Sequence, residues 1–138
     1  MTRAANFEHR LRVYWEDTDA GGVVFYANYL KFFERARTEW LRSLGIGQEA
    51  LRREHGVVFV VAETGVRYLE PARLDDLIAV TAEVTTAGRA SLELQQQARR
   101  VEPGPAKALA EGRIRIGCVD VHSFRPVRIP IDILERLA

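Results

Sequence analysis

The chain has 138 residues, of which 47% are hydrophobic and 28% are charged, and its formal net charge is +1. This length predicts one domain over residues 1–138, and the apolar content is sufficient for a buried core. The 20 basic residues are balanced by 19 acidic ones, which argues against a nucleic-acid-binding protein, because such proteins carry a basic excess on one face.

Cysteine content and hydropathy exclude further classes of protein. Cys118 is the only cysteine, so neither an intrachain disulfide nor a cysteine-based zinc site can form. The longest apolar run, Val57 to Ala62, is too short to span a bilayer, and the N-terminal residues lack the apolar segment of a signal peptide. We therefore expect a cytoplasmic protein without a membrane span.

The first predicted element is a strand that leads into an acidic loop. Hydrophobic and polar residues alternate over residues 7–16, as they do in a half-buried strand. Asp17 and Asp19 follow, and the pair Gly21-Gly22 allows a backbone turn that a side chain would obstruct. The loop is therefore predicted to hold carboxylates just ahead of the next element.

A strongly apolar helix is predicted from Asn28 to Leu44, because its hydrophobic residues recur with a period of 3.6 over a wide stripe. Asn28 is a residue type that caps helices, and Gly45 stands where a left-handed residue commonly ends one. A short second helix is expected from Gln48 to Glu54, ending at Gly56. We assign most aromatic side chains of this region to the core, among them Trp15, Phe25, Phe32, Phe33 and Trp40.

The rest of the chain has the pattern of strands joined by turns. Alternation predicts strands at residues 57–69, 77–86, 91–101 and 106–121, with a hairpin turn at residues 87–89. Gly65 marks either a bulge or a point of close approach. Residues 131–137 are expected to form one or two helical turns. The order of strand, buried helix and four strands predicts an α+β fold, with one antiparallel sheet that carries its helix on one face.

The residues best suited to catalysis lie between the first predicted strand and the long predicted helix. A carboxylate such as Asp19 can act as a nucleophile or as a general base on water. Free N–H groups at a helix start attract negative charge. A base beside such a donor suits acyl-transfer hydrolysis, whereas an acidic loop without one is only a solvated turn. We interpret Glu16 and Asp17 as exposed carboxylates without a chemical role.

The segment EDTDAGGVVFYANYLKFFERARTEWLR, residues 16–42, resembles the N-terminal signature of hotdog-fold acyl-CoA thioesterases. It is most similar to the Tol–Pal-associated acyl-CoA thioesterases and to the 4-hydroxybenzoyl-CoA thioesterases. The likeness continues through RYLEPARLDDLIAV, residues 67–80, and covers about residues 7–130. It implies a hotdog fold, in which an antiparallel sheet of about five to six strands wraps around one long central helix.

The resemblance also implies roles for individual residues. Asp19 would supply the catalytic carboxylate, and a backbone N–H near Tyr26 would polarise the thioester carbonyl. Tyr29 and Gly22 are expected beside the substrate. The Tol–Pal subgroup usually has histidine where this chain has Tyr26, whereas the 4-hydroxybenzoyl-CoA enzymes resemble this chain in having tyrosine, so the subgroup stays open.

The implied substrate is acyl-CoA, hydrolysed to a free acid and CoA without a metal or cofactor. Arg89, at the predicted hairpin tip, resembles the loop that contacts the phosphates of CoA in this family. Ser91, Arg67 and Arg73 are further candidates for contacts with the phosphates or the pantetheine of CoA. An open sheet edge and an uncovered sheet face predict a homo-oligomer, either a dimer or a tetramer. The resemblance adds that the active site lies between two subunits.

Two other classes of function compete with hydrolysis. A hotdog dehydratase or hydratase would need a histidine paired with an acid, and the spacing of His9, His55 and His122 suggests no such pair. A non-catalytic module that binds acyl-CoA or acyl carrier protein is the main alternative, and a partner protein of the cell envelope is a weaker one. No nucleophile elbow, phosphate-binding loop or dinucleotide fingerprint is present.

Overall fold

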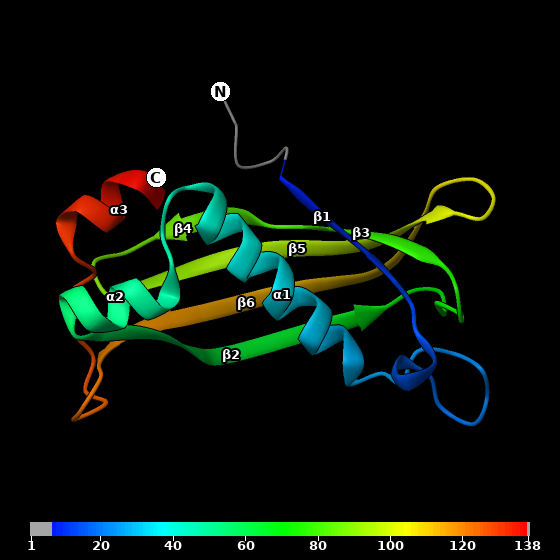
Figure 1. The fold of residues 1–138 in the computed structure, drawn as a ribbon, viewed down its shortest axis with the longest axis horizontal. Coiled ribbons are helices and arrows are strands. Elements are labelled where there is room, and N and C mark those ends of the chain that lie inside the picture. The colour runs from blue at the N-terminus through cyan, green and yellow to red at the C-terminus, as the bar shows by residue number, and fades with distance from the viewer. Residues whose placement is uncertain (1–6, 138) are drawn as a thin grey trace.

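A computed structural model describes residues 7–137 (Figure 1). Over these residues one antiparallel sheet of six strands carries the long helix α1 across one face. The strands are β1 (Glu8–Arg12), β2 (Val57–Tyr68), β3 (Leu77–Thr81), β4 (Glu83–Ala87), β5 (Ser91–Glu102) and β6 (Lys107–Asp120). The helices are α1 (Asn28–Ser43), α2 (Gln48–His55) and α3 (Ile131–Leu137). The predicted α+β arrangement, a sheet around one long helix, is confirmed. A single domain over residues 1–138 stays a prediction.

The strands lie in the order β1-β3-β5-β6-β2, and β4 pairs with β5 beyond the end of β3. We predicted one strand over residues 77–86, but the chain divides at Ala82, where hydrogen bonds from a neighbouring strand replace the regular ladder. The Gln96 side chain donates to the Thr81 carbonyl at 3.1 Å, and the Gln97 N–H donates to the Thr81 hydroxyl at 2.9 Å. Within residues 7–137, β2 pairs only with β6, which leaves its other edge open.

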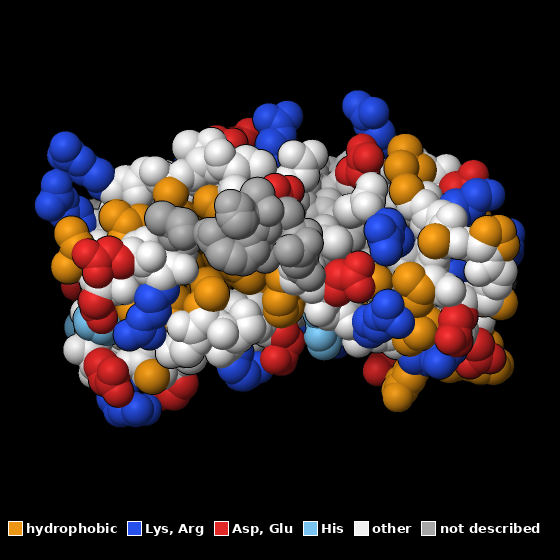
Figure 2. Space-filling view, turned by 90° about the horizontal axis from the view of Figure 1, so that it is seen from above, with side chains coloured by type: hydrophobic (Ala, Val, Ile, Leu, Met, Phe, Trp, Pro, Cys, Tyr) orange, Lys and Arg blue, Asp and Glu red, His pale blue; other side chains and the backbone are white. Residues whose placement is uncertain are grey.

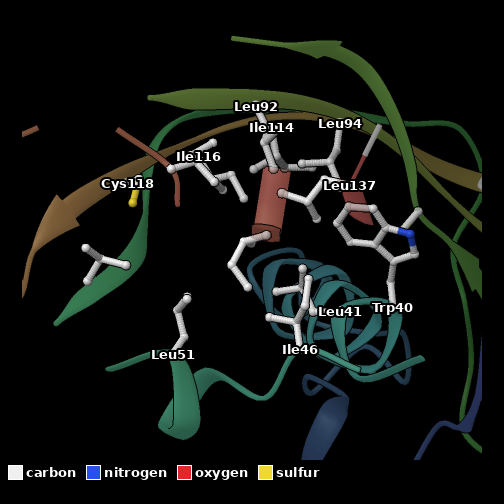
Figure 3. Close-up of a cluster of buried hydrophobic side chains, with 14 residues drawn as sticks. Trp40, Leu41, Ile46, Leu51, Leu92, Leu94, Ile114, Ile116, Cys118 and Leu137 are labelled. Carbon is white, nitrogen blue, oxygen red and sulfur yellow. The ribbon is translucent and has the colours of Figure 1, made fainter. Parts of the chain in front are cut away.

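Helix α1 packs closely on the sheet because one strand lacks a side chain at the contact. A Cβ atom on Gly112 of β6 would lie 2.8 Å from Cε2 of Phe33, which is closer than non-bonded carbon atoms approach. Phe33 is fully buried. Around the other half of α1, helices α2 and α3 close the core (Figure 3). The cluster of buried hydrophobic side chains between these helices and the sheet includes Trp40, Leu41, Ile46, Leu51, Leu92, Leu94, Ile114, Ile116, Cys118 and Leu137.

The ends of α1 differ in how well the sequence predicts them. Gly45 has a φ of +80°, and the Ile46 N–H donates to the Leu41 carbonyl at 2.9 Å, as a glycine-terminated helix requires. Asn28 does not cap the helix, because Ala27 occupies the capping position and makes no side-chain hydrogen bond. Asn28 is instead buried at the first helical position. The predicted end of the helix and its predicted start at Asn28 are confirmed, and only the capping role of Asn28 is wrong.

Two further sequence predictions are wrong in detail. Strand β1 ends at Arg12, and Trp15–Asp17 form a short 3-10 turn where we expected the strand to continue. In β2 the register with β6 shifts between Val61 and Glu63, whereas Gly65 pairs regularly with Arg113. Among residues 7–137, no helix is long and apolar enough to cross a membrane.

Candidate active site

The loop between β1 and α1 holds Asp19 in a fixed conformation. The Asp19 N–H donates to the Val23 carbonyl at 2.9 Å, and the chain reverses through Gly22, which has a φ of +82°. Oδ1 of Asp19 accepts hydrogen bonds from the N–H of Gly21 at 2.8 Å and of Val23 at 3.4 Å. Within residues 7–137, no hydrogen bond involves Oδ2 of this exposed carboxylate. One carboxylate oxygen is therefore anchored and the other is free for chemistry.

Asp17 is not the exposed carboxylate that we predicted. Its exposed fraction is 8%. Oδ1 accepts from the amide of Asn28 at 2.7 Å, and Oδ2 accepts from the Tyr14 N–H at 2.9 Å. Its backbone carbonyl accepts from the Phe25 N–H at 2.9 Å. Asp17 thus joins the 3-10 turn, the segment before α1 and the first residue of α1, which fixes the shape of the whole loop.

Tyr26 lies in the turn that precedes α1. The Asn28 N–H donates to the Phe25 carbonyl at 2.8 Å, so residues 25–28 form a tight turn. The Tyr26 carbonyl accepts a hydrogen bond from the Tyr68 hydroxyl at 3.0 Å. Among residues 7–137, no acceptor is bonded to the Tyr26 N–H. This N–H is an unused donor at the start of a helix, where the dipole favours negative charge.

Tyr29 lies beneath this turn, in the core. It is 3% exposed, and its ring meets Phe32 and Tyr68 edge-on, with centroids 5.8 Å and 5.5 Å away. Its hydroxyl accepts from the Ala72 N–H at 3.3 Å. Burial raises the pKa of Tyr29, which keeps the phenol neutral at physiological pH. Contact between Tyr29 and a substrate stays a prediction.

Several aromatic side chains around the loop are exposed rather than buried. Trp15 and Phe25 are 81% and 45% exposed, so their assignment to the core is wrong, while that of Phe32, Phe33 and Trp40 is confirmed. Tyr14 and Tyr26 are also exposed. At the end of the molecule that carries this loop, hydrophobic side chains lie among charged ones (Figure 2). Exposed aromatic side chains therefore flank the acidic loop in the sequence.

Arg89 and Ser91 lie far from this loop within one chain. They belong to the β4–β5 hairpin, and Figure 1 shows that hairpin and the acidic loop at opposite ends of the molecule. The Arg89 carbonyl accepts from the Ile129 N–H at 2.8 Å, which brings Arg128 next to the hairpin. Within residues 7–137, neither Arg89 nor Arg128 forms a salt bridge.

The comparisons with known proteins decide the family. The sequence profile of the thioesterase-like superfamily matches residues 13–137. The acyl-CoA thioesterase YbgC of Haemophilus influenzae is 41% identical over 127 residues, which are 92% of this chain and 90% of the relative. The acyl-CoA thioester hydrolase YbgC of Escherichia coli O6:H1 is 42% identical over 128 residues, covering 93% and 92% of the two chains. The chain belongs to the thioesterase-like superfamily.

Solved structures agree with the hotdog fold. A hypothetical protein from Aquifex aeolicus is 29% identical, with a TM-score of 0.84 over 96% of this chain and 99% of that one. A mutant 4-hydroxybenzoyl-CoA thioesterase complexed with 4-hydroxybenzoyl-CoA has a TM-score of 0.87 over 95% and 97% of the two chains, and at 18% identity it supports the fold alone. The predictions of a hotdog fold and of a thioester hydrolase are confirmed.

The other arginine candidates occupy different surroundings. The backbone of Arg73 forms a bridge with Val23, beside the acidic loop. Arg67 lies on the sheet face that points away from α1, where it lines a hollow of about 420 Å³. The same hollow is lined by Glu63, Glu93, Glu111, Arg113 and Arg115. Because its acidic and basic side chains balance, the hollow lacks the positive excess that a phosphate site needs.

The three histidines lie apart from the acidic loop. His9 is in β1, and the His122 N–H donates to the Asp120 carboxylate at 2.8 Å. Nε2 of His55 lies 3.7 Å from Oδ2 of Asp132, which connects the end of α2 to the start of α3. Among the described residues, no three His, Cys, Asp or Glu side chains are grouped as metal ligands would be.

Proposed function

We propose that this member of the superfamily hydrolyses acyl-CoA to a free acid and CoA, with Asp19 and the Tyr26 N–H as its reacting groups. The observation that carries the proposal is their arrangement on one short loop. One oxygen of Asp19 is anchored to the backbone while the other is free, and the Tyr26 N–H has no acceptor among residues 7–137. The names of the two YbgC relatives supply the substrate class.

The chemistry has two forms that use the same geometry. As a general base, Asp19 takes a proton from water, and the hydroxide attacks the thioester carbonyl carbon. As a nucleophile, the Asp19 carboxylate attacks that carbon and forms an anhydride, which water then cleaves. In both forms the carbonyl oxygen gains negative charge and accepts a hydrogen bond from the Tyr26 N–H. The C–S bond breaks, and the CoA thiolate leaves and takes up a proton.

Release of free thiol from acyl-CoA, followed with a thiol reagent, tests the proposed reaction. We expect stoichiometric thiol and free acid from purified protein, because a hydrolase cleaves the C–S bond of each molecule that it turns over. Acyl-CoA that binds and stays intact would identify a non-catalytic module instead, and the same assay with acylated acyl carrier protein would show whether that carrier is a substrate. A panel of short, long and aromatic acyl-CoAs, compared by kcat/KM, defines the acyl group.

The position of Arg89 and Ser91 supports a homo-oligomer in which CoA is bound by the neighbouring subunit. Both residues lie at the opposite end of the molecule from Asp19 in one chain. The free edge of β2 is a surface on which a second copy can pair, as open strand edges do. Arg128, beside Arg89, adds a second guanidinium for phosphate. A cytoplasmic location stays a prediction.

Subunit mixing tests the shared site. Asp19→Asn and Arg89→Ala subunits, each impaired alone, are expected to regain about a quarter of the wild-type kcat/KM when co-expressed, because half of random symmetric dimers are mixed and each mixed dimer has one intact site. Activity is measured at acyl-CoA concentrations below KM. No recovery in verified mixed oligomers would place both groups in one chain, and an active monomer of 15.6 kDa in sedimentation would exclude the dimer altogether.

Tyr26→Phe is expected to keep kcat within about tenfold of the wild-type value, because the proposed group is the backbone N–H, which the substitution retains. Tyr26 is 65% exposed, and a phenol hydroxyl is a weak proton acceptor compared with a carboxylate. Steady-state kinetics on the folded variant provide the measurement. A fall in kcat of about a hundredfold, typical of a missing general acid or base, would assign the hydroxyl to the chemistry.

A further inference from the structure

Tyr68 connects the edge strand of the sheet to the turn that carries the Tyr26 N–H. It is the last residue of β2, and its hydroxyl donates to the Tyr26 carbonyl across 42 residues of sequence, at 3.0 Å. Its ring meets that of Tyr26 edge-on at 6.3 Å and that of Tyr29 at 5.5 Å. The sequence gives no sign of this contact, because the two residues share no motif.

The backbone that carries Tyr68 is held firmly. Tyr68 pairs with Ala110 of β6, and the Leu69 N–H donates to the Leu109 carbonyl at 2.9 Å. The phenol itself lies at the edge of the candidate site, with 47% of the residue exposed. Burial raises the pKa of Tyr68, and the neighbouring Tyr26 raises it further, so the hydroxyl stays protonated and able to donate at neutral pH.

The turn at residues 25–28 is fixed on both sides of the peptide group that contains the Tyr26 N–H. On one side the Phe25 N–H donates to the Asp17 carbonyl at 2.9 Å. On the other side, among the described residues, the Tyr26 carbonyl has Tyr68 as its hydrogen-bond partner. Without the Tyr68 hydroxyl, the following peptide group can rotate, and the N–H that precedes it loses its fixed direction.

We propose that Tyr68 is a positioning residue: its hydroxyl holds the Tyr26 carbonyl so that the Tyr26 N–H points at the carbonyl oxygen of the thioester. This inference rests on the proposed function. Tyr68 acts through the backbone of Tyr26 and does not touch the substrate. Its loss therefore weakens binding of the developing oxyanion more than binding of the ground-state substrate.

Tyr68→Phe removes the hydroxyl and keeps the ring. We expect kcat to fall about tenfold while KM changes less than about twofold, since an interaction that strengthens in the transition state is lost. Tyr14→Phe is the matched control, because it deletes an equivalent hydroxyl from a 62% exposed residue beside the same loop and is expected to leave kcat unchanged. A rise in KM at constant kcat, or an equal effect of Tyr14→Phe, would overturn the inference.

A spectroscopic measurement tests the positioning without turnover. The chain has four tyrosines, so ¹⁵N-tyrosine labelling gives few backbone signals, and Tyr26→Phe identifies that of Tyr26. In Tyr68→Phe without substrate, the Tyr26 amide signal is expected to move, while Tyr14→Phe leaves it in place. An unmoved Tyr26 signal would contradict the inference. If wild-type protein releases no thiol from acyl-CoA, the proposed function fails, and the spectrum alone decides whether Tyr68 orients Tyr26.

Discussion

Asp19→Asn is expected to lower kcat by at least about 10²-fold while the protein folds normally, because the amide removes both the basicity and the nucleophilicity of the carboxylate. The loop geometry explains why the fold should survive. Oδ1 of Asp19 accepts hydrogen bonds from the N–H groups of Gly21 and Val23, and an asparagine oxygen can accept the same two bonds.

The control for this experiment lies in the same loop. Glu16→Gln makes the same chemical change on an exposed carboxylate, and its kcat is expected to match the wild-type value. Both variants are compared by thiol release from saturating acyl-CoA and by far-UV circular dichroism. Unchanged turnover in correctly folded Asp19→Asn would remove Asp19 from the mechanism.

Asp17→Ala is expected to lower the free energy of unfolding by about 3 kcal/mol, which is a large part of the stability of a small protein. The substitution leaves the buried amide of Asn28 and the N–H of Tyr14 without their acceptor. Buried donors that lose a charged partner are costly, since no water replaces it. The substitution should also lower kcat, because Asp17 fixes the loop that holds Asp19 and Tyr26.

Urea unfolding, followed by circular dichroism, measures this loss. Glu16→Ala is the matched control, because the adjacent carboxylate is exposed, and its free energy of unfolding is expected to change by less than about 0.5 kcal/mol. The free energy of unfolding of Asp17→Asn should lie between those of Asp17→Ala and Glu16→Ala. The asparagine oxygen can accept one hydrogen bond, while its NH₂ group faces a second donor. Equal stabilities of Asp17→Ala and Glu16→Ala would show that Asp17 does not organise the loop.

The conformation of the loop around Asp19 could be predicted because its geometry is local. The pair Gly21-Gly22 permits the reversal that anchors Asp19, and the φ of Gly22, +82°, is one that favours glycine. Four residues beyond this pair, Tyr26 lies in the turn before a helix that hydrophobic periodicity already predicted.

What the sequence could not predict depends on contacts between distant residues. Asp17 and Glu16 look alike as neighbouring acids, but only Asp17 meets the Asn28 side chain, eleven positions along the chain. Trp15 continues the alternation of β1, yet the bond from the Tyr14 N–H to Asp17 turns the chain and exposes the indole. Tyr68 reaches Tyr26 only because β2 ends beside the start of α1.

The most direct test of an acyl-CoA hydrolase centred on Asp19 is a single-turnover experiment, with protein in excess over acyl-CoA and with wild-type and Asp19→Asn proteins side by side. Free thiol and free acid are quantified in the same quenched samples. We predict that wild-type protein converts all acyl-CoA to equimolar thiol and acid, and that Asp19→Asn binds acyl-CoA but converts it at least about 10²-fold more slowly. Equal rates for the two proteins, or bound acyl-CoA that stays intact with wild-type protein, would contradict this assignment.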